Sequence, residues 1–256
     1  MKPQINPPLI ITGWIHWALL AVLIVVAQFD SRTILGINPW IKPMKFSASI
    51  AIYVWTLAWY LRYMADRVKP VRIISWGVAI SMLAEIFCIS VQSARGATSH
   101  YNVATPLDAG LFGAMGVMIA FNTLLVAWTL VLFCTAQPRI PRAYLWGIRL
   151  GLTLFLLAGV EGGVMIGHQA HTVGAPDGGP GLPLVNWSTQ HGDLRIAHFI
   201  GMHALQLLPL AGYLLSRLRW PESAQVTSIV VFGSLYFGLM AFLFWLAWQS
   251  RPLIAN

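Results

Sequence analysis

The sequence predicts an all-α integral membrane protein, a bundle of seven transmembrane helices that forms a single domain over residues 1–256. Of these 256 residues, 57% are hydrophobic and only 9% are charged, and the mean hydropathy is +0.69. Soluble domains carry about 25% charged residues, so an ordinary soluble enzyme is excluded. Two cysteines are too few for a disulfide scaffold. Seven stretches are apolar over the roughly 20 residues that a helix needs to cross a bilayer.

We place the seven spans near residues 8–28, 46–65, 71–92, 107–136, 144–168, 194–217 and 225–248. The first is longer than the apolar core of a cleavable signal peptide, so we expect it to stay in the membrane. The second opens at Lys45, whose side chain can extend to the interface. The third carries a stripe of polar residues. The fourth begins with Thr105-Pro106-Leu107-Asp108, which is typical of a helix capping box.

The last three spans are bounded by turn and capping residues. The fifth ends at the loop 169–193, whose glycines and prolines cannot continue a helix. We expect this loop to be an ordered lid, because it contains apolar anchors; a poorly ordered loop is the alternative. The sixth span follows Asp193, a good N-cap residue. The seventh contains no lysine for a retinal Schiff base. The predicted anchors are Leu182, Leu184, Val185 and Trp187.

The distribution of lysine and arginine predicts the orientation. With seven spans, ten of these residues fall on the N-terminal side of the membrane and six on the other side. This excess places the N-terminus in the cytoplasm and the C-terminus outside. We expect the inner (plasma) membrane of a bacterium and a site that opens to the outer side. The cations flank the spans and form no basic patch, so we expect no nucleic-acid partner.

Two glutamates lie inside predicted spans, where an ionisable group costs a few kcal/mol and so needs a partner, a cavity or a function. Glu85 belongs to one helical stripe that rises to the outer surface. Glu161 lies seven residues before His168 and on the same helical face. Gly159, Gly163 and Gly167 repeat at four-residue steps beside it, which indicates a close approach of a second helix. The stripe of the third span contains Ser81, Glu85, Cys88, Gln92 and Arg95.

Histidines also lie in the outer half of the predicted bundle. His198 and His203 are five residues apart on the sixth span and therefore face different directions. Counted inward at 1.5 Å per residue, Glu85 and Glu161 lie roughly 10 Å deep, His203 roughly 13 Å and His16 roughly 18 Å. If their helices are adjacent, the first three form one layer.

This layer is the candidate site. In a metal version Glu85, Glu161 and His203 are ligands of a transition metal ion, and His168 or His198 supports them. In a haem version His203 and His16 are the axial ligands. Five further residues are candidates for a gate at the outer mouth: Arg95, His100, His171, His191 and Arg195.

Structural roles remain open for the same residues. Glu85 can be a protonated carboxyl or the buried partner of Arg95, and His16 can make an interhelical hydrogen bond. Asp108 is expected to cap its helix. His168, His171 and His191 can be ordinary surface histidines.

These residues are compatible with three alternative functions. The first is a membrane-embedded oxidoreductase or electron-transfer protein with a metal or haem in the outer half of the bundle. The second is a proton-coupled small-molecule transporter that uses Glu85 and Glu161. The third is a non-catalytic subunit or assembly factor, as a homo-oligomer or part of a larger membrane complex. No HExxH, GxSxG, P-loop or CxxC motif is present, which leaves soluble-style catalytic sites without support.

Overall fold

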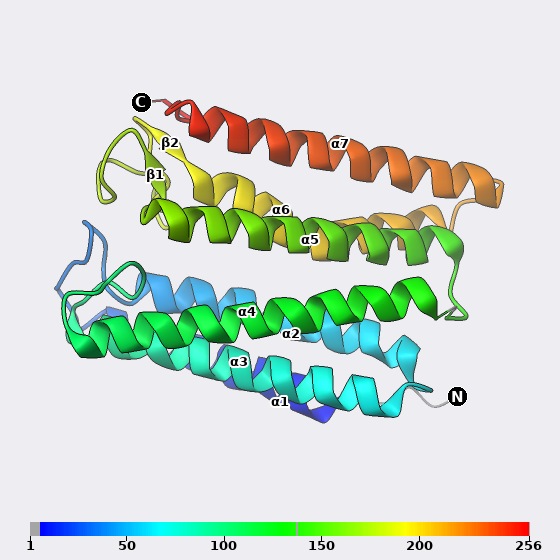
Figure 1. The fold of residues 1–256 in the computed structure, drawn as a ribbon, viewed down its shortest axis with the longest axis horizontal. Coiled ribbons are helices and arrows are strands. Elements are labelled where there is room, and N and C mark those ends of the chain that lie inside the picture. The colour runs from blue at the N-terminus through cyan, green and yellow to red at the C-terminus, as the bar shows by residue number, and fades with distance from the viewer. Residues whose placement is uncertain (1–5, 137, 256) are drawn as a thin grey trace. The chain divides into compact units, whose positions relative to one another are not determined.

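The structure, a computed structural model, describes residues 6–136 and 138–255 and is all-helical, as predicted (Figure 1). The helices are α1 (Pro7–Ala27), α2 (Ile41–Leu61), α3 (Val68–Arg95), α4 (Pro106–Thr135), α5 (Arg142–His168), α6 (Leu194–Leu215) and α7 (Glu222–Trp248). A 3-10 turn, η1 (Arg62–Met64), follows α2. Two short strands, β1 (Thr172–Val173) and β2 (Gly192–Asp193), pair antiparallel with Thr172 opposite Asp193.

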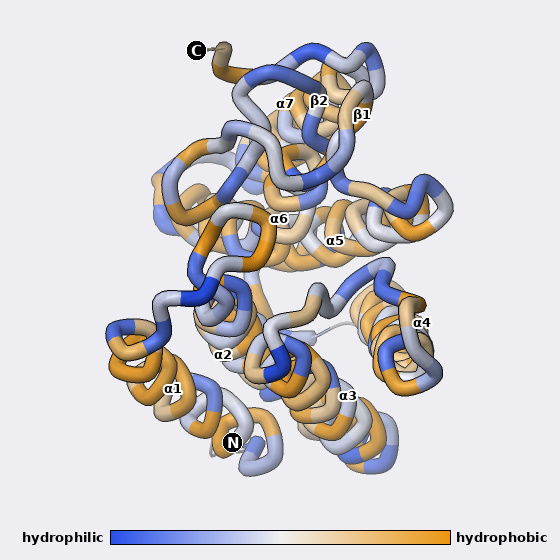
Figure 2. The backbone as a smooth tube through the Cα atoms, turned by 90° about the vertical axis from the view of Figure 1, so that its left-hand side faces the viewer, coloured by the Kyte–Doolittle hydropathy of each residue, from blue (hydrophilic) through white to orange (hydrophobic). Residues whose placement is uncertain are grey.

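Six of these helices, all except α2, are long and apolar enough to cross a membrane. Their outward faces carry large apolar side chains that water would not stabilise, and hydrophobic residues line the helices while hydrophilic residues gather in the loops (Figure 2). These features indicate a membrane protein. Examples of such exposed side chains are Trp14, Phe87, Leu124, Val160 and Leu235.

The helix that differs most from expectation is α2. It begins at Ile41, ahead of the predicted start at Phe46. Pro43 lies in its first turn, where a missing N–H costs no hydrogen bond, and the Asn38 side chain accepts from the Trp40 N–H at 3.0 Å just before the helix. The helix therefore starts earlier than predicted and includes Lys42 and Lys45. Lysine, tyrosine and tryptophan lower the hydropathy of α2, which is not among the six helices apolar enough to cross a membrane by composition alone.

The chain divides into two compact units, Met1–Trp128 and Thr129–Asn256, with α4 continuing from the first into the second. In unit 1, α1, α2 and α3 pack against one another. Gly13 of α1 meets the Trp55 indole of α2. The Tyr53 hydroxyl of α2 donates to the Asn122 side chain of α4 at 2.9 Å, and both residues are buried. Polar contacts therefore connect helices in the interior of unit 1.

Unit 2 is built on a close contact between α5 and α6. A Cβ placed on Gly147 would lie 2.5 Å from the Leu208 carbonyl oxygen, and one on Gly151 would lie 2.8 Å from that of Ala204. Helix α7 packs across both helices, and the Tyr236 hydroxyl donates to the Ile200 carbonyl at 2.7 Å. We refer to the close contact of α5 with α6 at Gly147 and Gly151 as the glycine seam.

The glycine seam corrects one sequence expectation. Gly163 and Gly167, expected to receive a second helix, are exposed, and a Cβ placed on either one would have no described atom within 4 Å. Glycines nearer the start of α5 make the contact instead, because those lie on the face that the α6 backbone approaches.

The loop 169–193 folds back on unit 2. The short β1–β2 pair closes its ends, and Trp187 packs edge-on against Phe199 with ring centroids 5.4 Å apart. Trp187 also joins a cluster with Ile196, Ala197 and Leu243. Leu184, by contrast, is 70% exposed, so the expectation that it anchors the loop is wrong for the described part of this unit.

Candidate functional site

The polar stripe predicted on α3 is buried in unit 1. Glu85 is only 5% exposed, and its Oε2 has no hydrogen-bond partner. Ser81, Cys88 and Gln92 on the same face are also buried. Lys42, from the first turn of α2, lies within electrostatic range of Glu85. The carboxyl of Glu85 thus has a cation in range and no hydrogen bond at one oxygen.

Arg95 ends this stripe and pairs with Asp108, which corrects the interpretation of Arg95 as the partner of Glu85. Its Nη1 donates to Asp108 Oδ1 and to Gln92 Oε1, both at 2.6 Å. Gln92 Nε2 donates to the same Asp108 oxygen at 2.8 Å. The N-cap half of the predicted capping box is confirmed, because the Asp108 N–H donates to Thr105 Oγ1 at 3.2 Å. The Asp108 carboxylate accepts from the Thr105 hydroxyl at 2.6 Å, and not from the Thr105 N–H as in a capping box. Asp108 therefore both contacts the N-cap of α4 and holds the end of α3.

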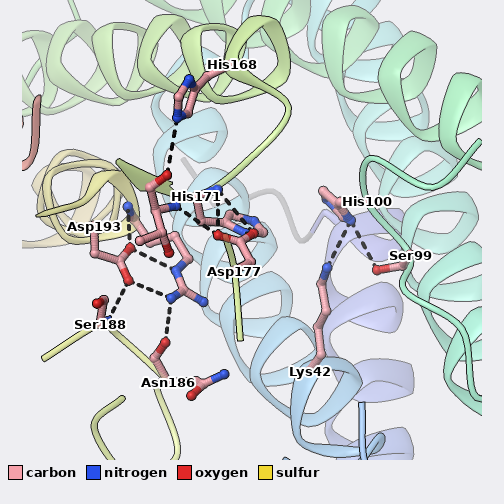
Figure 3. Close-up of polar contacts among 11 residues, drawn as sticks. Lys42, Ser99, His100, His168, His171, Asp177, Asn186, Ser188 and Asp193 are labelled. Carbon is pink, nitrogen blue, oxygen red and sulfur yellow. Dashed lines mark hydrogen bonds and ion pairs between the residues drawn. The ribbon is translucent and has the colours of Figure 1, made fainter. Parts of the chain in front are cut away.

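His100 lies in the loop after α3 and contacts Lys42 (Figure 3). Its Nδ1 is 3.1 Å from the Lys42 ammonium and 3.1 Å from the Ser99 hydroxyl. The ring also packs near Phe46 and Phe112, with centroids 6.0 and 6.3 Å away. Lys42 therefore contacts His100 and also lies within electrostatic range of Glu85.

His16 is fully buried on α1. Its Nδ1–H donates to the Thr12 carbonyl at 2.7 Å, and the Met82 backbone of α3 also lies close to the ring. No hydrogen bond of normal geometry reaches Nε2 among the described residues. A carbonyl only accepts, so this bond fixes the proton on Nδ1 and leaves a lone pair on Nε2 of the neutral ring.

In unit 2, Glu161 and His198 lie on facing helices. Glu161 on α5 is 9% exposed, and its Oε2 has no hydrogen-bond partner. His198 on α6 donates from Nδ1 to the Ala158 carbonyl, one turn before Glu161, at 2.7 Å. The His198 ring also approaches Gly162, so it occupies the space that this glycine leaves.

His203 takes a different position. Its Nδ1–H donates to the Phe199 carbonyl at 2.8 Å, and its ring lies on the Phe199 ring with centroids 4.1 Å apart. The side chain is partly exposed on α6. Among the described residues, no three His, Cys, Asp or Glu are grouped so that they could hold a metal ion. The metal set and the single layer of Glu85, Glu161 and His203 remain sequence predictions, since Glu85 belongs to the other unit.

The loop of unit 2 holds a histidine–aspartate pair (Figure 3). His171 Nδ1 lies 2.6 Å from Asp177 Oδ2, and the His171 and Thr172 N–H groups also donate to this carboxylate. Burial alone would raise the pKa of Asp177, but these hydrogen bonds and the His171 charge hold it well below the usual value. His171 is in electrostatic range of His198. His168 donates from Nε2 to the Thr172 carbonyl at 3.2 Å.

A second cluster in this loop surrounds Asp193, the confirmed N-cap of α6. Its carboxylate accepts from the Arg195 and Ser188 N–H groups at 3.0 and 2.8 Å and pairs with the Arg195 guanidinium (Figure 3). Arg195 also donates to the Asn186 carbonyl. A pocket of about 190 Å³ lies beside this cluster. His191 and Arg195, both predicted for the outer mouth, line it.

Sequence reasoning missed Lys42 and Asp177 as site residues. Lys42 is one of the six cations that the predicted topology places outside, and Asp177 stands in a stretch rich in proline and glycine that is typical of a turn. The only signal for Asp177 was its position six residues after a histidine within one loop. Its backbone contacts with His171 and Thr172 depend on the fold of that loop.

Comparison of this chain with protein-family models, with curated proteins and with solved structures found no match. Among the described residues, Glu85 in unit 1 and Glu161 in unit 2 are buried and have a carboxyl oxygen without a hydrogen bond. His100 contacts Lys42, which is within range of Glu85, and His198 contacts the helix that carries Glu161. Such groups can take up and release protons.

Proposed function

We propose that this protein is a proton-coupled small-molecule transporter in which Glu85 and Glu161 carry the protons. The observation that carries the proposal is the unpartnered Oε2 atom of both buried glutamates. A permanently ionised carboxylate without hydrogen bonds is costly in such surroundings. A carboxyl that binds and releases a proton during transport needs no permanent partner.

Nearby groups support a route for protons to each glutamate. In unit 1, Lys42 is in range of Glu85 and contacts His100. In unit 2, His198 donates to the backbone one turn from Glu161 and is in range of His171. Histidine is suited to such relays because its ordinary pKa of about 6.5 is close to physiological pH.

The proposal includes the predicted topology of seven spans with a cytoplasmic N-terminus. Helix α2 has 21 residues, the same length as α1. A helix of this length rises about 30 Å, enough to cross the hydrocarbon core. This topology places three segments outside, namely 28–40, 96–105 and the loop 169–193. The contacts of His100 in unit 1 and of His171 in unit 2 would then lie at the outer side.

The test uses purified protein in liposomes loaded with a pH-sensitive dye. Panels of small carboxylates, amines, sugars and amino acids are added outside at acidic pH, and acidification of the lumen is followed. We expect at least one panel to accelerate proton entry, and Glu85→Gln and Glu161→Gln to abolish the acceleration. Glu222→Gln is the matched control, because Glu222 is exposed at the start of α7 and pairs with Arg142 at 3.4 Å. Acceleration that survives in both glutamine variants would contradict the proposal.

A second candidate function, a membrane oxidoreductase with a haem or a metal, is favoured by His16. No hydrogen bond of normal geometry reaches its buried Nε2 among the described residues, and the lone pair of this nitrogen is of the kind that ligates haem iron. Metal content and the Soret absorbance of the purified protein test this candidate. Near one iron or other metal per chain, lost in His16→Ala and retained in Glu222→Gln, would support it. No metal or haem above background in the wild type would exclude it.

A further inference from the structure

A pocket of about 330 Å³ lies at the end of unit 1 where α1 and α3 begin and α2 ends. Three of its lining residues are joined by hydrogen bonds. The Asn6 amide donates to the Ser75 hydroxyl at 2.7 Å, and that hydroxyl donates to the Val71 carbonyl at 2.6 Å. The Ser75 hydroxyl therefore both accepts and donates a hydrogen bond within the protein.

The charged groups of this pocket are two arginines. Arg62 and Arg72 line the pocket, and no aspartate or glutamate does among the described residues. The Arg62 guanidinium lies over the Trp59 ring, 4.3 Å from the ring centroid. An arginine over an aromatic face can still donate hydrogen bonds from its guanidinium to an anionic ligand. Arg72 makes no ion pair within the described part of the chain, and the nearby Asp66 pairs with Arg67 at 3.6 Å. The pocket thus carries two positive charges that no acidic side chain of its described lining neutralises.

The walls of the pocket continue into an apolar face. Val68 and Trp76 line the pocket and are 59% and 54% exposed. One turn above Trp76 on α3, Ile80 is 57% exposed. A ligand with an anionic head and an apolar tail would contact the arginines with its head and this face of α3 with its tail.

We propose that this pocket binds the phosphate headgroup of an anionic phospholipid, with the acyl chains along Trp76 and Ile80. Guanidinium groups bind phosphate oxygens through paired, charge-assisted hydrogen bonds. Basic pockets between membrane helices are suited to anionic lipid headgroups, and tryptophan is suited to the level of the headgroups. The proposal does not depend on the transport function.

The experiment measures lipid retention by the full-length protein in detergent, by native mass spectrometry. Phosphatidylglycerol is compared with zwitterionic phosphatidylcholine of the same chain length. We expect at least tenfold preferential retention of phosphatidylglycerol by the wild type. The variant R62Q/R72Q should lose this preference, whereas R62K/R72K should keep a part of it. Lys69→Gln is the matched control, since Lys69 is an exposed cation of the same segment that does not line the pocket.

Two further arms separate the lipid from other sources of phosphate. Inorganic phosphate and glycerol 3-phosphate are added as soluble competitors at millimolar concentration. Retention of phosphatidylglycerol despite both competitors supports a lipid site, whereas full displacement by either overturns it in favour of a soluble phosphate. Equal retention of the two lipids by the wild type, or an unchanged preference in R62Q/R72Q that unfolds at the wild-type temperature, also overturns the proposal.

Discussion

Unit 1 and unit 2 bury the same chemical group in different surroundings. Glu85 of unit 1 lies on a buried polar stripe and has Lys42 in electrostatic range. Glu161 of unit 2 lies on the helix that forms the glycine seam, and no described lysine or arginine acts on it. Both carboxyls have an Oε2 atom without a hydrogen bond.

This difference shows that a buried acid can be kept in place by two means. In unit 1 a nearby cation can balance the charge of the carboxylate when it is ionised. In unit 2 the backbone contact of α5 with α6 fixes the helix that carries the carboxyl, although no described cation balances its charge. We therefore expect unit 2 to depend more on packing and unit 1 more on polar groups.

The largest effect is expected at the glycine seam. In Gly147→Ala the new methyl group would lie 2.5 Å from a backbone oxygen of α6, which cannot move without the helix. Overpacking of this kind costs about 3 kcal/mol. In unit 1, the new methyl group of Gly13→Ala would overlap Trp55 Nε1, so the indole, which donates to the Ile10 carbonyl and packs against Trp14, would have to shift. Because a side chain and not a helix backbone must move, we expect a smaller cost of about 2 kcal/mol.

Denaturant unfolding in mild detergent measures both variants. Gly163→Ala is the control, because nothing described lies within 4 Å of its new methyl group, and it should unfold like the wild type or later. If Gly13→Ala costs as much as Gly147→Ala, the two units do not differ in their dependence on backbone contact.

The next effect concerns the carboxyls themselves. Glu161→Leu removes a buried oxygen without a partner, and we expect it to raise the free energy of unfolding by about 2 kcal/mol while it abolishes transport. Glu85→Leu should give a smaller gain, since it also removes the acidic group in range of Lys42. The same unfolding assay measures both. A loss of stability in Glu161→Leu would mean that the carboxyl makes an essential contact.

The seven helices were predictable because each has its own apolar run, and the N-caps Thr105 and Asp193 were predictable because a cap is a local contact. The start of α2 was missed because Lys42 and Lys45 interrupt the apolar run there. The helix boundary also depends on Pro43 in the first turn and on the turn that Asn38 forms before the helix. Local sequence signals thus suffice for the helices and for contacts within one turn.

Contacts between helices were not predictable in the same way. Two series of glycines on α5 have four-residue spacing, and only the position of α6 decides that Gly147 and Gly151, and not Gly163, make the seam. Arg95 has Glu85 on its own helix face but pairs with Asp108 of α4. Periodicity gives the face of a residue, whereas the partner on that face comes from another part of the chain. The prediction of a single domain and of one shared layer of site residues therefore stays a prediction.

A smaller effect is expected at the cap of α4 in unit 1. Thr105→Ala removes the oxygen that accepts from the Asp108 N–H, and the loss of such a cap costs about 1 kcal/mol. Thr105→Ser keeps the hydroxyl and should retain most of the stability. Amide hydrogen exchange in the first turn of α4 locates the effect. Exchange that is unchanged in Thr105→Ala would mean that Arg95 and Gln92 alone hold this end of the helix.

The smallest effect is local to the loop of unit 2 and depends on pH. Because the pKa of Asp177 is lowered in the folded loop, its carboxylate stabilises the loop above the ordinary aspartate pKa of about 3.9. As the pH falls below that value, the unfolded loop binds a proton that the folded loop does not, and the stabilisation weakens. Asp177→Asn should therefore speed amide exchange at His171 and Thr172 several-fold at pH 7. At pH 3 the ratio of variant to wild-type rates should be smaller, and a ratio that is the same at both pH values would show that the contacts with Asp177 act through shape and not through charge.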